Sequence, residues 1–475
     1  MIILGTNSVK DTGYDVDNSL RFNDGSSDNL ARTPSSASNQ KTWTWSGWVK
    51  RASGLGTFQS FFGVNNGNLD SAAFELGFNA SNQLTALPWN FFFLKTNAVY
   101  RDTSAWYHVV FAFDTTQSTS TNRFKLYVNG QQVTSFASTS YPSLNTDWVV
   151  NSTASHRLGI VNYVSAGGLT RQFDGYMAEV CLIDGQQLDP TSFGEFDEDS
   201  GIWKPIDVSG LTFGTNGFYQ EYKQSGTGTN SSGMGADTSG NDNHFAVNNL
   251  TAIDQSTDTC TNNFATINSL DNYFYASTLS EGNLKQTCNS GNYSFNTSTF
   301  GVSQGKWYVE VKVSGSNMRN AVGIVDKVTT GTTNAIENLL NGWSYAQGEV
   351  YNNSSQVAVL GTPSSGNIVG IYLDLDNNKL YFAINGTIQN SGTGFSITAS
   401  ASTTNGNYFF AFGDNAASNS DVNEVNFGSP SFTISSGNTD ANGYGNFEYN
   451  PSSGTFDGAS KDFYALCTKN LAEYG

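Results

Sequence analysis

The residue types that most often carry catalysis are sparse in this chain and lie far apart. The three histidines are His108, His156 and His244, and none belongs to a Ser-x-x-Lys, Gly-x-Ser-x-Gly or His-Glu-x-x-His pattern. His108 falls within the strand-like run WYHVV, where a hydrogen-bonded, half-buried histidine is the expected state. We therefore expect no catalytic triad, and we predict that the chain is not an enzyme.

Oxygen-rich loops make calcium the ion to consider. The runs 24–28 (DGSSD), 237–242 (DTSGND) and 374–377 (DLDN) offer the hard oxygen ligands, about six to eight in number, that calcium requires. None of the three has EF-hand or nonapeptide spacing, and Asx turns explain each of them without a metal. Both alternatives stay open: no cofactor at all, or calcium with candidate ligands at Asp24, Asp28, Asp237 and Asp242.

Aromatic residues are the remaining candidates for chemistry. A shallow sugar site needs a flat apolar face for stacking, with amide or carboxylate groups beside it. Trp89 and Asn90 follow Pro88, which favours a loop, and we predict that both contact a ligand. Three other tryptophans lie in the alternating run KTWTWSGWVK, which predicts that they pack in the core. They are Trp43, Trp45 and Trp48.

The composition excludes several classes of partner. The chain has 475 residues, with 22 Lys and Arg against 40 Asp and Glu, and a formal net charge of −18. Without a basic stripe to displace phosphate counterions, we expect no nucleic-acid partner. The longest apolar runs, such as Phe91–Leu94, fall far below the roughly 18–20 residues that cross a bilayer, so we expect no membrane insertion. The opening MIILGTNSVK has no basic region and no long apolar run, so we also expect no secretory leader.

The four cysteines are too few to staple the fold. None forms a Cys-x-x-Cys pair, so neither a zinc ribbon nor a thioredoxin-like motif is predicted. Buried free thiols are the expected state, and a bridge between Cys260 and Cys288 is the alternative that the sequence leaves open.

The elements that must position these residues are short strands. Gly, Ser, Asn and Thr interrupt every apolar stretch, and the runs between them alternate with period two, as in Trp106–Asp114 (WYHVVFAFD). This pattern is typical of antiparallel sandwiches, and we predict an all-β fold of two tandem β-sandwich, jelly-roll-like domains. Asn129–Gly130 and Asn385–Gly386 each follow a KLY strand and supply the positive φ values of a type I′ hairpin turn.

The recurrence of this hairpin context in both halves predicts two domains of one architecture. We expect an N-terminal arm over residues 1–17, a first sandwich over 18–200, a joint over 201–250, a second sandwich over 251–430, and a C-terminal tail over 431–475 that packs on the second sandwich. Within the first, Pro190–Asp199 (PTSFGEFDED) is the best candidate for a short helix. The stretch near 225–240 is rich in Gly, Ser, Thr and Asn, which favours a linker.

The first half resembles a laminin-G-like, concanavalin-type jelly roll. The matching runs are SLRFNDGSSDNL, WTWSGWVKR, WYHVVFAFD, KLYVNG and FDGYMAEVCLIDGQQLDPTSFGEF. The second half resembles a SPRY domain through GKWYVEVKV, GWSYAQGEVYNN, GNIVGIYLDLDNNKLYFAING and VNFG. In SPRY domains the region of GWSYAQGEVYNN lies near a variable binding surface. The resemblance therefore implies further ligand contacts at Trp343, Tyr345, Tyr351 and Asn352.

The order of the two domains resembles an arrangement in bacteriophages of marine bacteria. It includes a DSGIWKP-type joint, a TNNFATINSLD-type segment and a closing GYGNFEYNPSSG…FYALCTKNL. The resemblance implies a virion protein, as a tail-fibre, tail-associated or capsid-surface component. Its implied partners are other virion proteins and a host-surface glycan or protein, and we expect a homo-oligomer on the particle.

Concanavalin-type jelly rolls also include laminarinase-like hydrolases, whose two carboxylates lie on one strand in a Glu-x-Asp-x-x-Glu pattern. The nearest match here is Glu195-Phe-Asp197-Glu198-Asp199-Ser200, in which serine replaces the last glutamate. We interpret this run as a solvated acidic cap. Three functions thus remain to be compared: host recognition by a virion protein, purely structural decoration of a particle, and, as the weakest alternative, hydrolysis of a glycan.

Overall fold

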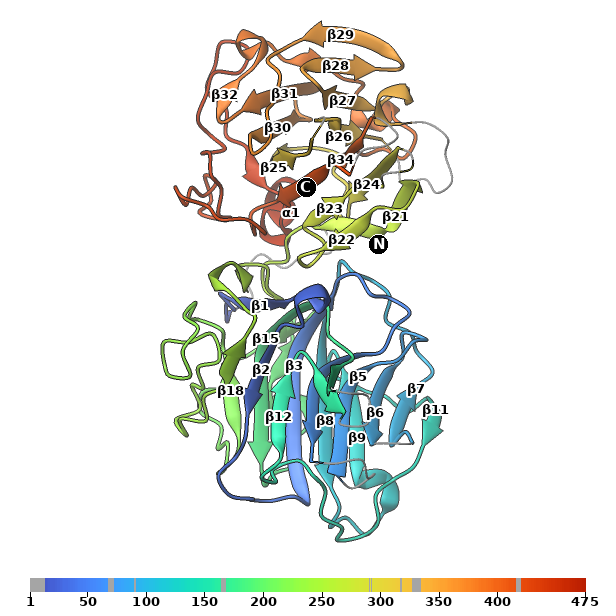
Figure 1. Ribbon diagram of the computed structural model, residues 1–475, viewed down its shortest axis with the longest axis vertical. Helices are drawn as coiled ribbons and strands as arrows, with labels where there is room; N and C mark the ends of the chain where they lie inside the picture. The colour runs from blue at the N-terminus through green and yellow to red at the C-terminus, as the bar shows by residue number, and fades with distance from the viewer. Residues whose placement is uncertain are drawn as a thin grey trace. The chain divides into compact units, whose positions relative to one another are not determined.

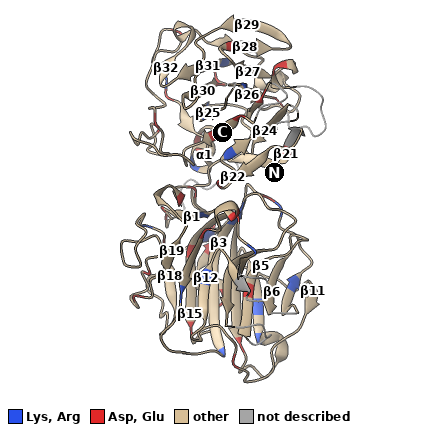
Figure 2. Cartoon of the chain, in the orientation of Figure 1, with Lys and Arg blue, Asp and Glu red and all other residues tan. Residues whose placement is uncertain are grey.

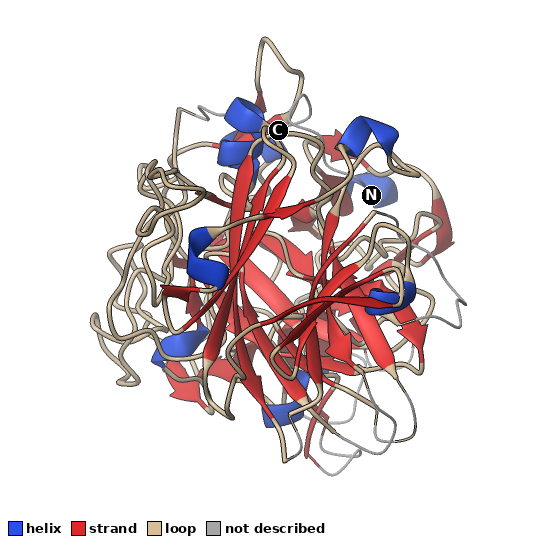
Figure 3. Ribbon diagram, turned by 90° about the horizontal axis from the view of Figure 1, so that it is seen from above, coloured by secondary structure: helices blue, strands red, loops and turns tan. Residues whose placement is uncertain are grey.

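The computed structural model describes residues 13–66, 72–88, 91–163, 168–289, 291, 293–316, 318–326, 335–415 and 420–475. Strands dominate these residues, and their α-helical content is the seven-residue α1 (Thr468–Tyr474). Figure 3 shows the strands with only short helical turns between them. The chain divides into two compact units between Thr261 and Asn262. The predicted all-β fold of tandem antiparallel sandwiches is confirmed.

The first unit contains two eight-stranded antiparallel sheets, whose strands run side by side in Figure 1. In order of pairing, the first sheet consists of β10 (Gln131–Gln132), β9 (Phe124–Val128), β8 (Trp106–Asp114), β3 (Thr42–Arg51), β15 (Gly175–Asp184), β1 (Ser19–Phe22) and β20 (Gln255–Ser256), with β18 (Phe218–Gln220) also on β15. The second sheet consists of β11 (Phe136–Thr139), β7 (Leu94–Thr96), β6 (Leu84–Pro88), β5 (Ala73–Phe78), β4 (Gln59–Asn65), β12 (Ser155–Leu158), β2 (Asn29–Arg32) and β19 (Ala246–Asn248). Two small hairpins complete the unit, β13 (Val161–Tyr163) with β14 (Gly168–Thr170) and β16 (Gly194–Phe196) with β17 (Trp203–Pro205).

The strand register defines which face of the second sheet is the core. One row of directly paired residues crosses five strands and is fully buried between the sheets: Leu30, Leu158, Phe62, Leu76 and Ala86. Because side chains alternate along a strand, the neighbouring row must lie on the outer face. That row is Ala31, Arg157, Gly63, Glu75 and Leu87.

The tryptophans of β3 are buried, as predicted. Trp43 and Trp45 are fully enclosed in the sandwich core, and Trp43 stacks on Phe113 with ring centroids 4.8 Å apart. Trp48 is also buried but lies on the other face of β3, where it packs with His108. Each buried aromatic ring contributes on the order of 2–3 kcal/mol through the apolar area that it removes from water.

The predicted joint over residues 201–250 is wrong, because this segment is part of the first unit. β18 pairs with β15, and β19 pairs with β2. Phe213, Phe218 and Phe245 are buried beside them. The glycine- and serine-rich stretch forms the turns between these short strands. The unit also extends past residue 250, since β20 pairs with β1 and Lys50 forms a buried ion pair with Asp258.

The helix predicted over 190–199 is also wrong. Residues Pro190–Ser192 form one 3-10 turn, which Asp189 caps by accepting the Thr191 N–H. The chain then enters β16, which pairs with β17.

The predicted N-terminal arm falls mostly on residues 1–12, outside the described residues. The described part of it lies on the first unit, where the buried Val16 donates its N–H to Thr261 Oγ1 at 3.0 Å.

The second unit is built from a seven-stranded and a nine-stranded sheet. The former consists of β21 (Ile267–Phe274), β24 (Ser294–Ser298), β34 (Phe409–Asp414), β26 (Asn320–Val325), β27 (Trp343–Ala346), β28 (Glu349–Asn352) and β29 (Ser355–Val359). The latter consists of β22 (Thr278–Ser280), β23 (Lys285–Thr287), β35 (Val422–Asn426), β25 (Lys306–Ser314), β30 (Ile368–Asp374), β31 (Lys379–Ile384) and β32 (Thr387–Ile388), with β33 (Phe395–Ser396) on β31 and β36 (Tyr464–Ala465) parallel to β25.

The C-terminal residues cover the outer face of the nine-stranded sheet. A paired row of tyrosines crosses β25, β30 and β31 on this face: Tyr308, Tyr372 and Tyr381. Three buried rings from the C-terminal segment pack on that row: Phe447, Phe456 and Phe463. Residues 431–475 therefore supply a third layer to the second unit.

Both Asn-Gly turns have the predicted conformation. The φ values are 47° and 76° at Asn129 and Gly130, and 46° and 76° at Asn385 and Gly386. Each turn joins two paired strands, β9 to β10 and β31 to β32. Positive φ at both central positions defines the type I′ turn, so these hairpins are confirmed.

All four cysteines are free thiols, so the alternative of a Cys260–Cys288 bridge is not realised. Acidic and basic residues are scattered over both units (Figure 2). Within the described ranges, no helix is both long and apolar enough to traverse a bilayer.

Candidate functional site

The outer face of the second sheet of the first unit carries an ion pair at its centre. Glu75 on β5 is 3% exposed and accepts a hydrogen bond from Arg171 Nη1. The guanidinium of Arg171 lies over the ring of Phe58, 4.6 Å from its centroid. Arg171 is held in the left-handed region at φ 58°, and its carbonyl accepts the N–H of Ser60 at the start of β4. We call Glu75, Arg171 and Phe58 the Glu75 cluster.

A second polar group lies two strands away on the same face. Arg157 on β12 donates from Nη1 to Asn29 Oδ1 at 2.8 Å, and Asn248 Nδ2 donates to the same oxygen at 3.2 Å. The Nε of Arg157 is buried and has no hydrogen-bond acceptor among the described residues. Burial lowers the pKa of Arg157, which reflects the cost of holding its charge away from water.

Gly63 separates these two groups in the register. It is the direct neighbour of both Glu75 and Arg157, and Val161 of β13 packs where a side chain would otherwise stand. Two strand spacings place Arg157 about 10 Å from Glu75. Lys95 adds a third cation on this face, with its Nζ 4.8 Å from the ring centroid of Phe92. The face thus combines three cations, one carboxylate and partly exposed aromatic rings, a set that can bind acceptor-rich ligands.

Sequence reasoning missed this face. Glu75 stands alone in the apolar run AFELGF, and a single charged residue within a strand carries no recognisable pattern. Its partners come from two other segments that only the strand register brings together. The ligand contacts predicted for this unit, Trp89 and Asn90, lie outside the described residues.

In the second unit, two of the predicted contact residues are buried. Trp343 is 8% exposed and packs against Phe395 in the core. Tyr345 is 2% exposed and donates its hydroxyl hydrogen to the carbonyl of Gly361. Tyr345 also lines a small pocket, partly open to solvent, together with Asn320 and Gln347.

The other two predicted residues serve the local structure of β28. Tyr351 is half-buried and donates to Glu349 Oε2 at 2.6 Å. Asn352 donates from Nδ2 to the carbonyls of Leu340 and Gly342 at 3.0 and 2.9 Å. The structure therefore brings only Tyr345 to a pocket, and it does not gather the four residues into one surface.

The candidate calcium ligands fall into two separate loops of the first unit. Asp24 is exposed, whereas Asp28 is buried and accepts the N–H of Asn23 at 3.0 Å. Asp237 is buried and accepts three backbone N–H groups, from Tyr219, Ser239 and Asn243. Asp242 is exposed and lies 3.6 Å from His244 Nε2. The buried carboxylates thus serve chain turns, as the Asx-turn alternative describes.

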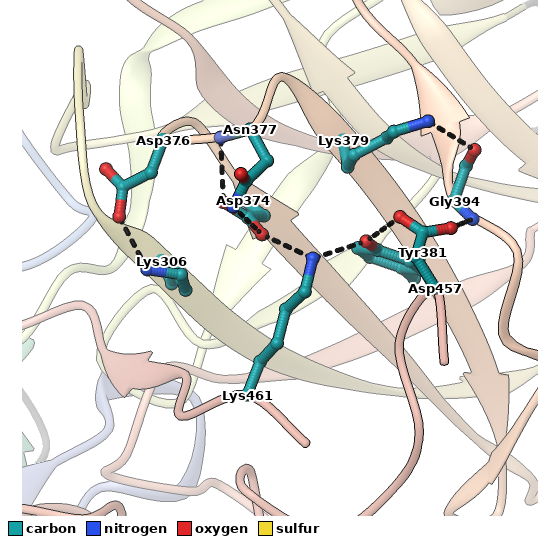
Figure 4. Close-up of polar contacts among 9 residues, drawn as sticks. All are labelled: Lys306, Asp374, Asp376, Asn377, Lys379, Tyr381, Gly394, Asp457 and Lys461. Carbon is teal, nitrogen blue, oxygen red and sulfur yellow. Dashed lines mark hydrogen bonds and ion pairs between the residues drawn. The ribbon is translucent and has the colours of Figure 1, made fainter. Parts of the chain in front are cut away.

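In the third oxygen-rich loop, which follows β30, the carboxylates pair with lysine side chains from other segments (Figure 4). Asp374 is fully buried, and its carboxylate accepts hydrogen bonds from Lys461 Nζ at 2.9 Å and from the Asn377 backbone N–H at 3.0 Å. Lys461 also donates to Tyr381 Oη at 2.9 Å, and that hydroxyl donates to Asp457 at 2.7 Å. These contacts attach the C-terminal layer to the sheet.

Replacement of Lys461 by methionine is expected to destabilise the second unit by about 1–2 kcal/mol, because buried Asp374 would lose its cation. Urea unfolding followed by circular dichroism would measure the change. Lys306→Met is the matched control, since Lys306 pairs with the more exposed Asp376, where a loss of at most about 0.5 kcal/mol is expected. Equal losses in the two variants would contradict the assignment.

The acidic run near residue 195 forms an exposed hairpin rather than a groove. Lys204 Nζ lies 3.4 Å from both Glu195 Oε1 and Asp197 Oδ2, and Asp197 also accepts the Ser200 N–H.

His108 is fully buried, and burial lowers its pKa to about 3. Its Nδ1 accepts from Trp203 Nε1 at 3.0 Å, so its Nε2 donates to Ser46 Oγ at 2.9 Å.

Comparison with known proteins places the first unit in a fold class. The family described as the Concanavalin A-like lectin/glucanases superfamily (Laminin_G_3) matches residues 24–186. These residues include most strands of both sheets of the first unit, and the jelly-roll prediction for that unit is thereby confirmed. No curated protein sequence matches the chain.

Several solved structures are similar to parts of the chain. The SPRY domain of human HERC1 is 15% identical, with 34% of this chain and 96% of that domain covered and a TM-score of 0.29. A heptameric SAP-like pentraxin from Limulus polyphemus is 13% identical, with 37% and 79% covered and a TM-score of 0.28. A Bacteroides ovatus protein assigned to carbohydrate binding is 12% identical, with 50% and 59% covered and a TM-score of 0.32. At these TM-scores the likeness assigns no function.

Proposed function

We propose that the chain is a non-catalytic recognition protein that binds an acidic glycan on the outer face of the second sheet of its first unit. The grouping of Lys95, Arg157 and Arg171 on this face, in a chain whose formal net charge is −18, is the observation that carries this proposal. A carboxylate or sulfate group of a sugar would pair with such cations. The match of residues 24–186 to a family of lectins and glucanases supports the same function.

The charge on this face supports an acidic rather than a neutral sugar. The chain as a whole is strongly acidic, yet Lys95, Arg157 and Arg171 lie on this face, where Glu75 pairs with Arg171. Phe58 and Phe92 provide rings for stacking at its edges. Because Val161 covers Gly63 between the two groups, we expect the uronic acid or sulfate groups of a polysaccharide to bind beside Arg157 rather than over Gly63.

The register around Glu75 argues against glycan hydrolysis. Hydrolysis needs two carboxyl groups about 5–9.5 Å apart on one face. The direct neighbours of Glu75 on the adjacent strands are Gly63 and Leu87, and its neighbours two positions along β5 are Ala73 and Gly77. Glu75 is moreover neutralised by Arg171. The second acidic pair, Glu195 and Asp197, is bound by Lys204.

Glycan binding by the full-length chain would test the proposal. Alginate, a uronic acid polymer, is expected to bind, whereas neutral dextran is not. Arg157→Gln is expected to weaken binding at least tenfold, about 1.4 kcal/mol, in isothermal titration calorimetry. Arg123→Gln is the matched control, because Arg123 donates only to loop carbonyls elsewhere in the unit. Equal loss in both variants, equal binding of dextran, or release of new reducing ends would overturn the proposal.

For the biological setting we propose a virion, as a tail-fibre, tail-associated or capsid-surface component. The support is the resemblance of the domain order to proteins of marine bacteriophages.

Purely structural decoration is the second candidate, and one observation favours it. β29 is the last strand of its sheet within the described residues, and its Val357 and Val359 are 48% and 72% exposed. Such an edge can pair with a strand of another virion protein. The chain's position in a map of the intact particle would separate tail adsorption from shell decoration.

A further inference from the structure

One end of the second unit has a polar layer inside its core. Gln286 Nε2 donates to Asn296 Oδ1 at 2.8 Å and to the carbonyl of Phe412 at 2.9 Å. Asn423 Nδ2 donates to Gln286 Oε1 at 2.8 Å and to the carbonyl of Gly413 at 3.0 Å. These amides are almost fully buried and satisfy one another, as a stable buried network requires.

Three further side chains face inward at the same end. Asn320 on β26 and Asp414 on β34 are direct register partners. They share the face of Val322 and Phe412, which pack in the core. Asp421 lies two residues before Asn423, so it points to the same interior from the opposite sheet. Its carbonyl accepts the Cys288 N–H at 2.9 Å, which continues the pairing of β23 with β35.

Each of these side chains has one oxygen without a donor. Asp414 Oδ1 accepts the Ser294 N–H at 2.9 Å, and Asp421 Oδ2 accepts the Arg319 N–H at 2.8 Å. Asp414 Oδ2, Asp421 Oδ1 and Asn320 Oδ1 are buried and find no donor among the described residues. Their residues are 2%, 0% and 6% exposed.

The orientation of the Asn320 amide is fixed by its nitrogen. Nδ2 donates to the Val422 carbonyl at 3.0 Å and to Asn423 Oδ1 at 2.9 Å. A flip would place an oxygen against two acceptors, so Oδ1 must face away from them. All three unsatisfied atoms are therefore hydrogen-bond acceptors, and what they lack is a donor or a cation.

Two of these acceptors belong to carboxyl groups. The guanidinium of Arg319 donates to Gln347 Oε1, and its charge partly offsets the effect of burial on the pKa of Asp421. Burial, with a contribution from Asp421, raises the pKa of Asp414 to about 7, and burial also raises the pKa of Asp421. The Cys288 thiol is close to both carboxylates, and burial raises its pKa as well. Each of these shifts reflects negative charge held away from water.

We propose that Asp414, Asp421 and Asn320 bind a calcium ion at this end of the second unit. Two carboxylates and an amide oxygen from separate segments are ligands of the kind that calcium prefers, and its flexible coordination tolerates their irregular arrangement. Backbone carbonyls and water would complete the set of about six to eight oxygens. Asn320 also lines a small, partly open pocket together with Tyr345 and Gln347. The site is independent of the proposed glycan site.

Calcium titration of the full-length chain, first treated with EDTA, would test this site. Calcium is expected to raise the unfolding temperature of the second unit by about 4 °C or more and to give a binding isotherm in calorimetry, with a much smaller effect of magnesium. Asp414→Asn and Asp421→Asn are each expected to abolish both responses. Asp376→Asn is the matched control, since Asp376 is exposed on the same unit, and it should respond like the parent chain. Near-ultraviolet circular dichroism would confirm that each variant folds.

Three results would overturn the proposal. The parent chain could show no response to calcium. The response could persist in Asp414→Asn and Asp421→Asn, which would place the ion elsewhere. Asp414→Asn could raise the unfolding temperature while calcium leaves the unfolding temperature of the parent chain unchanged. That last result would mean that a proton on Asp414, rather than a metal, satisfies Asn320 Oδ1.

Discussion

Asp258→Ala is expected to lower the free energy of unfolding of the first unit by about 3–5 kcal/mol, because it leaves a buried lysine without its counter-ion. Lys50 Nζ lies 2.6 Å from Asp258 Oδ2, and the two side chains are 0% and 1% exposed. Burial already lowers the pKa of Lys50, and the charge of Asp258 opposes that shift. Asp258 Oδ1 also accepts from Trp106 Nε1 at 3.1 Å.

Urea unfolding followed by tryptophan fluorescence would measure this loss. Seven of the nine tryptophans precede residue 262 in the sequence, so the signal reports mainly on the first unit. The double variant Lys50→Met/Asp258→Leu removes both charges and is expected to recover most of the stability. A loss below about 1 kcal/mol in Asp258→Ala would show that the lysine finds other solvation.

The second large effect is a pH dependence that originates at Glu179. Its side chain is 8% exposed on β15, at a bulge where its φ is 52°. Its Oε2 accepts from the hydroxyl of Tyr219 and from that of Tyr14 at 3.2 Å. Burial raises the pKa of Glu179 to about 7 from an ordinary value of 4.5, with Glu221 adding to the shift and Lys223 opposing it.

The sign of the effect follows from the protons bound. Between pH 4.5 and 7 the folded chain keeps a proton on Glu179 that the unfolded chain releases. The stability of the first unit is therefore expected to fall as the pH rises through this range, by about 3 kcal/mol from this group. Glu179→Gln keeps an oxygen that accepts from the tyrosines and removes the titration, so its slope should be flatter.

Urea unfolding of the parent chain and of Glu179→Gln at pH 4.5, 5.5, 6.5 and 7.5 would compare the two slopes. Only the difference between the slopes belongs to Glu179, because other buried carboxyls titrate in both proteins. Glu221→Gln serves as a control at a neighbouring carboxylate, and it should change the slope far less. Identical slopes for the parent chain and Glu179→Gln would contradict the assignment.

The local features of the fold could be predicted from the sequence. The Asn-Gly turns depend on two adjacent residues, and the burial of Trp43 and Trp45 depends on alternation within one strand. The segment 201–250 could not be assigned in this way, because its strands are three residues long and are separated by turns. The aromatic residues Phe213, Phe218 and Phe245 were the available indication that this segment packs on a sheet.

The sites were harder to predict than the fold because their residues meet only through long-range register. Glu75 meets Arg171 across 96 positions of sequence, and Arg157 meets Asn29 across 128. Asp414 and Asn320 are brought together by the pairing of β34 with β26. The predicted ligand contacts at Trp343, Tyr351 and Asn352 stay predictions. They rested on a region of the SPRY resemblance, whereas these side chains stabilise their own sheet.

The C-terminal layer has a consequence for anyone who engineers the second unit. A fragment cut after β35 would keep every strand of the seven-stranded sheet, yet it would expose the ring faces of Tyr308, Tyr372 and Tyr381 to water. Contiguous apolar area of this kind promotes self-association. Soluble expression of the unit should therefore require residues 431–475, and a fusion partner is best joined ahead of residue 262.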